Sequence, residues 1–210
     1  MRNLIIFILC FIIISSVISS NEKDMKYHSD PVYYYTLDGP NWALACYFKP
    51  GDFGITGYNY KIKIIGFIGD VADGSADIYV TSKEEGGKPI CNPDNSWEGK
   101  EYGPKSWHIN KSYPNYDDCN VYSYEWHYSK DIIKFWCIYN LNSKGYPPYP
   151  TCSYLYQSTI NSLTWDPQIH YWIKGCPSNP YFNWCIHCVI VYWGTDIEST
   201  SLGAVKALFR

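Results

Sequence analysis

The chain has 210 residues and a formal net charge of −3, and it combines 22 Tyr and 9 Trp with only 2 Met. It contains no run of lysine and arginine, which excludes the basic surface of a typical nucleic-acid-binding protein. Abundant aromatic and β-branched residues, interrupted by glycine and proline, favour strands joined by turns and predict an all-β fold.

The first twenty residues have the three-part layout of a secretory signal peptide. Arg2 provides a positive start, an apolar run extends from Leu4 to Ile18, and serines follow as small residues for cleavage. This run of about 15 residues is shorter than the roughly 20 that a membrane-spanning helix needs. We therefore expect residues 1–20 to be a cleaved signal peptide, the remaining chain to have no membrane span, and the protein to be secreted, either free or at the cell surface.

The first part of the remaining chain is expected to contain two short strands. Residues 21–30 are polar, which is typical of a loose leader. Aromatic residues at 32–36 and a mainly apolar run at 42–48 each have the length and composition of a strand. Pro50 and Gly51 end the second strand.

The next stretch has the clearest strand pattern in the chain. Residues 58–64 alternate apolar and polar side chains, and residues 65–67 continue the apolar row on the opposite parity. This change of parity indicates a β-bulge, for which Gly66 gives the backbone freedom. Asp-Gly turn chemistry follows at 70–75, and an alternating strand then returns. Residues 56–81 are therefore predicted to form a β-hairpin.

The rest of the chain continues the pattern of strands and turns. Gly86 and Gly87 lie in a predicted turn or loop. A near-continuous apolar run at 132–139 is typical of a central strand that is buried on both faces. Further strands are predicted at residues 106–109, 121–128, 152–157, 169–173 and 182–193, with an irregular proline-rich loop at 142–150.

These elements add up to about eight to ten strands, with no amphipathic helix of any length. Strands spaced by turn residues in this way predict an antiparallel β-sandwich or jelly roll, and not a parallel α/β sheet. We expect a single β-sandwich domain over residues 21–194, followed by a linker or tail at 195–210.

The cysteines predict that this sandwich is stapled by disulfides. Eight of them follow residue 20, an even number that is typical of disulfide bonds in an exported protein. If Cys185 and Cys188 share a strand, their Cα atoms are about 10 Å apart. A disulfide needs less than roughly 7 Å, so each of the two requires another partner. The pairing is left open among Cys46, Cys91, Cys119, Cys137, Cys152, Cys176, Cys185 and Cys188.

Three segments together give the chain a resemblance to a known type of module. These are the strand sequence at 77–80, the Gly-Gly-Lys-Pro turn at 86–89 and the closing apolar strand at 184–192. Their order resembles that in the β-sandwich, jelly-roll-like accessory modules of secreted bacterial proteins. The resemblance covers residues 32–194 and implies a non-catalytic extracellular role, although eight cysteines are a departure from such modules. It implies no functional residues.

Exposed aromatic rings in loops are the best candidates for a binding site. Tyr and Trp rings stack on sugar rings, while neighbouring polar groups bind the hydroxyls. The loop regions at 97–107 and 142–149 favour exposed rings. The alternative for each ring is a place in the core or in a cross-strand pair, which is the common role of aromatic residues in a β protein. The candidate binding residues are Trp97, Trp107, Tyr146 and Tyr149.

Acid–base catalysis has one leading candidate, Glu125, with Asp77 and Asp166 as potential partners in space. A glycoside-acting enzyme needs two carboxylates on one groove, about 5 to 9 Å apart. The sequence brings no two of them together. The spacing of Cys185 and Cys188 is that of metal and redox sites, but a single such pair within a strand favours structural disulfides. We expect no catalytic residues, metal or other cofactor.

The sequence therefore favours a secreted, non-catalytic binding or adhesion module, with glycans or a cell-surface partner as its ligand. Two alternatives stay open. One is a small glycoside-acting enzyme on the same jelly-roll fold, and the other is a purely structural domain of a larger cell-surface protein.

Overall fold

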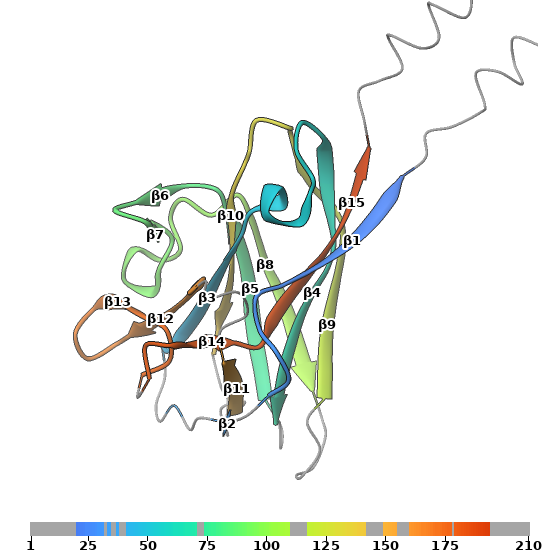
Figure 1. Ribbon diagram of the computed structural model, residues 1–210. Coiled ribbons are helices and arrows are strands. Elements are labelled where there is room, and N and C mark those ends of the chain that lie inside the picture. The colour runs from blue at the N-terminus through green and yellow to red at the C-terminus, as the bar shows by residue number, and fades with distance from the viewer. Residues whose placement is uncertain are drawn as a thin grey trace, which may run out of the picture.

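The computed structural model describes residues 20–31, 33–34, 37, 41–70, 74–109, 117–141, 149–154, 160–177 and 179–193. These residues form fifteen strands and two short 3-10 helices, η1 (Pro50–Phe53) and η2 (Pro93–Asn95). Every strand pairing is antiparallel, and no α-helix occurs within these ranges (Figure 1). The predicted all-β class is confirmed.

The first large sheet has seven strands. Its main path runs β1-β15-β4-β11-β14, with β9 paired to β4 and β2 paired to β11. Its strands are β1 (Asn21–Lys26), β2 (Tyr33–Tyr34), β4 (Asn59–Asp70), β9 (Asp117–Tyr128), β11 (Tyr149–Tyr154), β14 (Phe182–Trp184) and β15 (Ile186–Trp193).

The second large sheet has six strands in the order β13-β12-β3-β10-β5-β8. Its central strand β10 pairs with β3 and β5, and all six of its residues are buried, so the predicted central strand is confirmed. The strands are β3 (Ala43–Phe48), β5 (Gly74–Thr81), β8 (Tyr102–Ile109), β10 (Phe135–Asn140), β12 (Ser162–Asp166) and β13 (Tyr171–Lys174).

The two large sheets share one core. Phe48 and Ile78 from the six-stranded sheet pack in the same cluster as Ile62 and Phe67 from the seven-stranded sheet, and all four side chains are fully buried. The sheets therefore lie face to face in a sandwich-like arrangement. The jelly-roll order of connections stays a prediction.

A second, smaller apolar cluster covers the other face of the six-stranded sheet. Trp136, Trp165 and Trp172 belong to it, together with Cys91 from the segment that connects β5 to β8. This segment includes a tight hairpin of β6 (Glu84–Glu85) and β7 (Lys88–Pro89). The cluster explains why β10 is buried on both faces, since its side chains alternate between the two apolar layers.

The predicted hairpin at 56–81 is wrong as a paired unit. Both of its strands exist, but β4 belongs to the seven-stranded sheet and β5 to the six-stranded sheet. The chain therefore crosses between the layers where a tight turn was expected. A bulge is present, but at Lys63 and not beside Gly66: between Ile62 and Ile64, β4 has one extra residue against β15. Against β9 the longer side is β9 itself, where residues 123–125 face Lys63 alone.

The loose leader expected at 21–30 is also wrong for its first part. Residues 21–26 form β1, which pairs with β15 along its full length. Only Met25 of this strand is buried, whereas the other five side chains are exposed. A strand that gives its backbone to the sheet and presents charged side chains to solvent is suited to a sheet edge.

The predicted strand at 182–193 is interrupted at Cys185, between β14 and β15. The two parts pair with different strands, since β14 pairs with β11 whereas β15 pairs with β1 and β4.

No helix in the described ranges has the length and hydrophobicity that crossing a membrane requires.

The seven cysteines whose side chains are described are all buried and form no disulfide with one another, so the predicted disulfide staples are not shown. The side chain of Cys119 lies outside the described residues. The predicted signal peptide, apart from Ser20, and the predicted tail beyond residue 194 also lie outside them.

Candidate functional site

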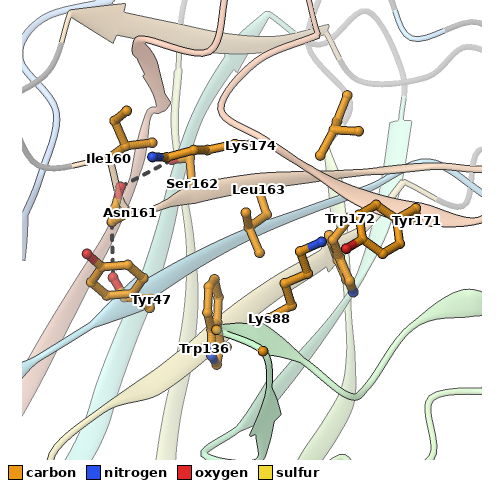
Figure 2. Close-up of a pocket in the computed structure, with 13 residues that line it drawn as sticks. Tyr47, Lys88, Trp136, Ile160, Asn161, Ser162, Leu163, Tyr171, Trp172 and Lys174 are labelled. Carbon is orange, nitrogen blue, oxygen red and sulfur yellow. Dashed lines mark hydrogen bonds between the residues drawn. The ribbon is translucent and has the colours of Figure 1, made fainter.

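A cavity of about 440 Å³ lies on the outer face of the six-stranded sheet, beside the smaller apolar cluster (Figure 2). Strands β3, β10, β12 and β13 provide its walls together with the turn of the β6–β7 hairpin. Its most prominent side chains are four aromatic residues and two lysines: Tyr47, Trp136, Tyr171, Trp172, Lys88 and Lys174. We refer to it as the aromatic cavity.

The first end of the aromatic cavity is an edge-to-face pair of rings. Tyr47 and Trp136 lie on neighbouring strands with their ring centroids 5.3 Å apart. The Lys134 ammonium lies 4.7 Å from the Tyr47 centroid and 4.8 Å from that of Trp136. It also forms an ion pair with Glu84, which accepts a 3.1 Å hydrogen bond from Trp136 Nε1. These contacts fix both rings, because each is held by a neighbour on another element.

Burial at this end favours the protonated form of Tyr47, and hydrogen bonds favour the ionised form of Glu84. Burial raises the pKa of Tyr47, and the carboxylates of Asp52 and Glu84 add to this effect. Burial also acts to raise the pKa of Glu84, but the hydrogen bonds from Lys134 and Trp136 outweigh it and the net pKa is lowered. Glu84 is therefore an ion-pair partner here and not a proton donor.

The second end of the aromatic cavity combines Tyr171 with Lys88. The Lys88 ammonium lies 3.2 Å from the Tyr171 ring centroid, and 56% of Tyr171 is exposed. The hairpin determines this position: Gly86 and Gly87 have φ of 58° and 76°, as a two-residue type I′ turn requires. Figure 2 shows Tyr171 and Lys88 at the opposite side of Leu163 from Tyr47.

Trp172 forms the buried part of the second end. Its ring packs edge-to-face on Trp165 with 5.4 Å between centroids. Its indole N–H is buried and makes no hydrogen bond to any residue that the structure describes. Trp172 lines the cavity, so its wall contains an unpaired polar group. A buried donor without an acceptor lowers the stability of the folded state.

The polar wall between the two ends is internally hydrogen-bonded. Asn161 donates to the Tyr47 carbonyl at 3.0 Å, and its backbone N–H donates to Asn183 Oδ1 at 3.0 Å. The Ser162 hydroxyl donates to Asn161 Oδ1 at 3.2 Å and accepts from the backbone N–H of Trp184 at 2.9 Å. These groups hold β12 in place, so the rings and lysines are the groups that a ligand would meet.

The lining of the aromatic cavity combines rings, lysines and hydrogen-bonding groups. The residues that line the aromatic cavity in the described structure include no carboxylate, histidine or cysteine. Rings provide flat apolar surfaces, and the lysines and the Tyr47 hydroxyl provide hydrogen-bond donors. Across the described residues there is also no group of three or more His, Cys, Asp or Glu placed to hold a metal ion.

Of the four predicted binding residues, only Trp97 has a described side chain, and it does not line this cavity. Trp97 is half-buried and stacks on Tyr79, with 4.4 Å between centroids and planes 10° apart, at the edge of the smaller apolar cluster. The side chains of Trp107, Tyr146 and Tyr149 lie outside the described residues.

The three candidate carboxylates each have a separate partner. Glu125 is exposed and lies 3.4 Å from the Lys105 ammonium. Its own backbone N–H and Lys105 lower its pKa, which suits a carboxylate and not a general acid. Asp77 accepts a 2.6 Å hydrogen bond from Ser106, and Asp166 accepts a 2.8 Å hydrogen bond from the backbone of Gln168.

The four rings of the aromatic cavity lie in predicted strands, but none of them is a predicted site residue. Tyr47 and Trp136 lie in the predicted strands 42–48 and 132–139, where the continuous apolar runs indicate burial alone. The adjacent rings at 171 and 172 were a usable signal, because neighbours on a strand point to opposite faces and one of two large rings must leave the core.

Comparison with known proteins finds no family model, curated protein or solved structure that matches this chain. The resemblance to bacterial accessory modules therefore depends on strand and turn residues alone.

Proposed function

We propose that this protein is a secreted, non-catalytic binding module that takes a glycan into the aromatic cavity. The observation that supports it most is the grouping of Tyr47, Trp136, Tyr171 and Trp172 around one cavity with two lysines. The volume of about 440 Å³ lies within the roughly 300–1,000 Å³ of small-ligand sites. Secretion is inferred from the signal-peptide layout of residues 1–20.

A sugar would use the two ends of the cavity differently. Tyr171 is the most exposed of the rings that line the cavity, so it provides the stacking surface for the C–H face of a sugar. In the free protein the Lys88 ammonium lies over the face of that ring. Binding would move the ammonium aside, where it can donate hydrogen bonds to sugar hydroxyls. Tyr47, held in place by Trp136, provides a second donor at the far end.

The proposal is tested by a glycan-array screen of the full chain with matched tyrosine variants. Tyr171→Ala is expected to reduce binding at least tenfold, because it removes the stacking surface. Tyr181→Ala is the control, since Tyr181 is also an exposed tyrosine, with 68% of its surface accessible, and it does not line the cavity. Both variants are checked for folding by circular dichroism.

The outcomes separate the alternatives. Loss of binding in Tyr171→Ala alone supports the proposal. Equal binding by both variants overturns the placement at the aromatic cavity, and Trp97→Ala then tests the loop site that the sequence predicts. If the folded protein binds no glycan, the proposed glycan-binding function is wrong, and the alternative of a purely structural domain is favoured.

A further inference from the structure

The buried cysteines are concentrated in one part of the molecule. Five of the seven described thiols belong to the core between the two large sheets, and each is completely buried. They come from strands β3, β10, β11 and β15 and from the segment that follows β13. These five cysteines are Cys46, Cys137, Cys152, Cys176 and Cys188.

The first close pair spans the two sheets. Cys137 lies on β10, and Tyr139, two residues further on the same face, donates a 3.3 Å hydrogen bond to the carbonyl of Ile65. Ile65 on β4 is the direct register partner of Cys188 on β15. Cys137 and Cys188 therefore face each other across the core, and their side chains are in hydrogen-bond contact.

The second close pair lies at the end of the seven-stranded sheet. Cys152 on β11 is the register partner of Trp184 on β14. The Cys176 thiol donates a 3.8 Å hydrogen bond to the carbonyl of Phe182, two residues before Trp184 on the same strand. Both thiols thus lie beside β14, at positions two residues apart along that strand. They are also in hydrogen-bond contact with each other.

We propose that the exported protein carries two disulfide bonds, Cys137–Cys188 and Cys152–Cys176. The first would join the six-stranded sheet to the seven-stranded sheet, and the second would join β11 to the segment between β13 and β14. Cys46 is not part of either pair. Its sulfur lies 3.1 Å from Ser162 Oγ and 4.0 Å from the Trp184 carbonyl, so it has polar partners of its own.

The bonds form by exchange with a small-molecule or protein disulfide. One cysteine thiolate attacks the oxidant and releases one of its sulfurs as a thiol, which leaves a mixed disulfide. The second cysteine then displaces the other sulfur, so the chain loses two hydrogen atoms and the oxidant becomes two thiols. Burial raises the pKa of Cys137 and Cys176 far above the usual value, so the thiolate is absent in the closed core. The exchange therefore occurs during folding.

Peptide mapping of the full chain tests the pairing. The chain is refolded in a mixture of glutathione and glutathione disulfide, so the result does not depend on secretion or on glycan binding. Remaining thiols are alkylated, and the protein is digested with trypsin and chymotrypsin without reduction. Cleavage after Lys144 and Lys174 places Cys137 and Cys152 in two different peptides, and a third peptide contains Cys176, Cys185 and Cys188. Cleavage after Phe182 or Trp184 then separates Cys176 from Cys185 and Cys188. Two cross-linked peptides are expected, and both disappear on reduction.

Two serine variants identify the sulfur in the first bond. Cys188→Ser is expected to remove the Cys137 cross-link and leave the Cys152–Cys176 cross-link. Cys185→Ser, three residues away and equally buried, is expected to leave both. Recovery of Cys137 and Cys188 as alkylated thiols, or cross-linking of Cys137 to Cys46, overturns the proposal. If Cys188→Ser does not fold, the peptide map of the unchanged chain decides the question.

Discussion

The imidazole of His187 lies directly over the backbone of Gly66. The two residues are register partners on β15 and β4, and a Cβ atom added at Gly66 would lie 1.9 Å from His187 Cε1. Gly66 is therefore required by the close approach of a ring, whereas the sequence suggested a role in the β-bulge. The bulge is at Lys63, three residues earlier.

Gly66→Ala is expected to destabilise the fold by about 1–3 kcal/mol, because both partners are buried and the ring must move. Thermal unfolding should show a melting temperature several degrees lower. Gly51→Ala is the matched control and should have little effect, since its Cβ would meet only Thr56 Cγ2 at 3.5 Å. Adding His187→Ala to Gly66→Ala should recover part of the loss. A double variant no more stable than Gly66→Ala would contradict the steric explanation.

His28 makes the stability of the protein sensitive to mild acid. It is buried, and burial lowers its pKa from the usual 6.5, with the charges of His187 and Lys26 acting in the same direction and the Ser29 carbonyl and Asp24 opposing. The unfolded chain therefore binds a proton more readily than the folded protein as the pH falls below about 6.5. Stability is expected to be present above that pH and to decrease below it.

Urea unfolding at pH 7.5 and pH 5.5 measures this effect. His28→Gln should reduce the difference in unfolding free energy between the two pH values, and His127→Gln, which changes an exposed histidine, should leave it unchanged. An unchanged difference in His28→Gln would show that another group controls the acid sensitivity.

The contrast between β4 and β5 shows how far the sequence could predict this fold. Alternation along residues 58–67 and 76–81 correctly indicates two strands, because each strand buries one face. It does not indicate which strand is the neighbour, because pairing depends on residues far away in the chain. β4 pairs with β15 and β9, and β5 pairs with β10 and β8.

The candidate site was beyond prediction for the same reason. Tyr47 and Trp136 meet only because β3 and β10 are neighbours, and Tyr171 meets Lys88 only because the β6–β7 hairpin lies beside β13. The sequence pattern within one strand carries no information on which residues of other strands it contacts. Strand β12 was missed because its polar residues Ser162 and Thr164 are buried through hydrogen bonds and not through apolar side chains.

Thr164 links two buried strands through its hydroxyl. Thr164 Oγ1 donates to the Gly175 carbonyl at 2.7 Å and accepts from Trp184 Nε1 at 3.0 Å, and all of these groups are buried. Thr164→Val retains the shape and removes both hydrogen bonds, so it should destabilise the protein by about 1–3 kcal/mol. Thr164→Ser keeps the hydroxyl and should lose less. The measurement is urea unfolding, and equal losses in both variants would point to packing as the cause.

Glu84 is expected to hold the first end of the aromatic cavity in place. Trp136 is 1% exposed, so removing the acceptor of its N–H leaves a buried donor unpaired. Glu84→Ala should therefore cost about 1 kcal/mol from the lost hydrogen bond, with little added by the partly exposed ion pair to Lys134.

Glu84→Gln separates the hydrogen bond from the charge. It keeps an acceptor for Trp136 and should retain most of the stability, whereas Glu85→Ala, a change of the exposed neighbour, should be neutral. Glycan affinity should decrease in Glu84→Ala, since Trp136 supports Tyr47 at the cavity wall. If Glu84→Gln is as damaging as Glu84→Ala for stability and binding, the charge of Glu84, and not its hydrogen bond, positions the ring.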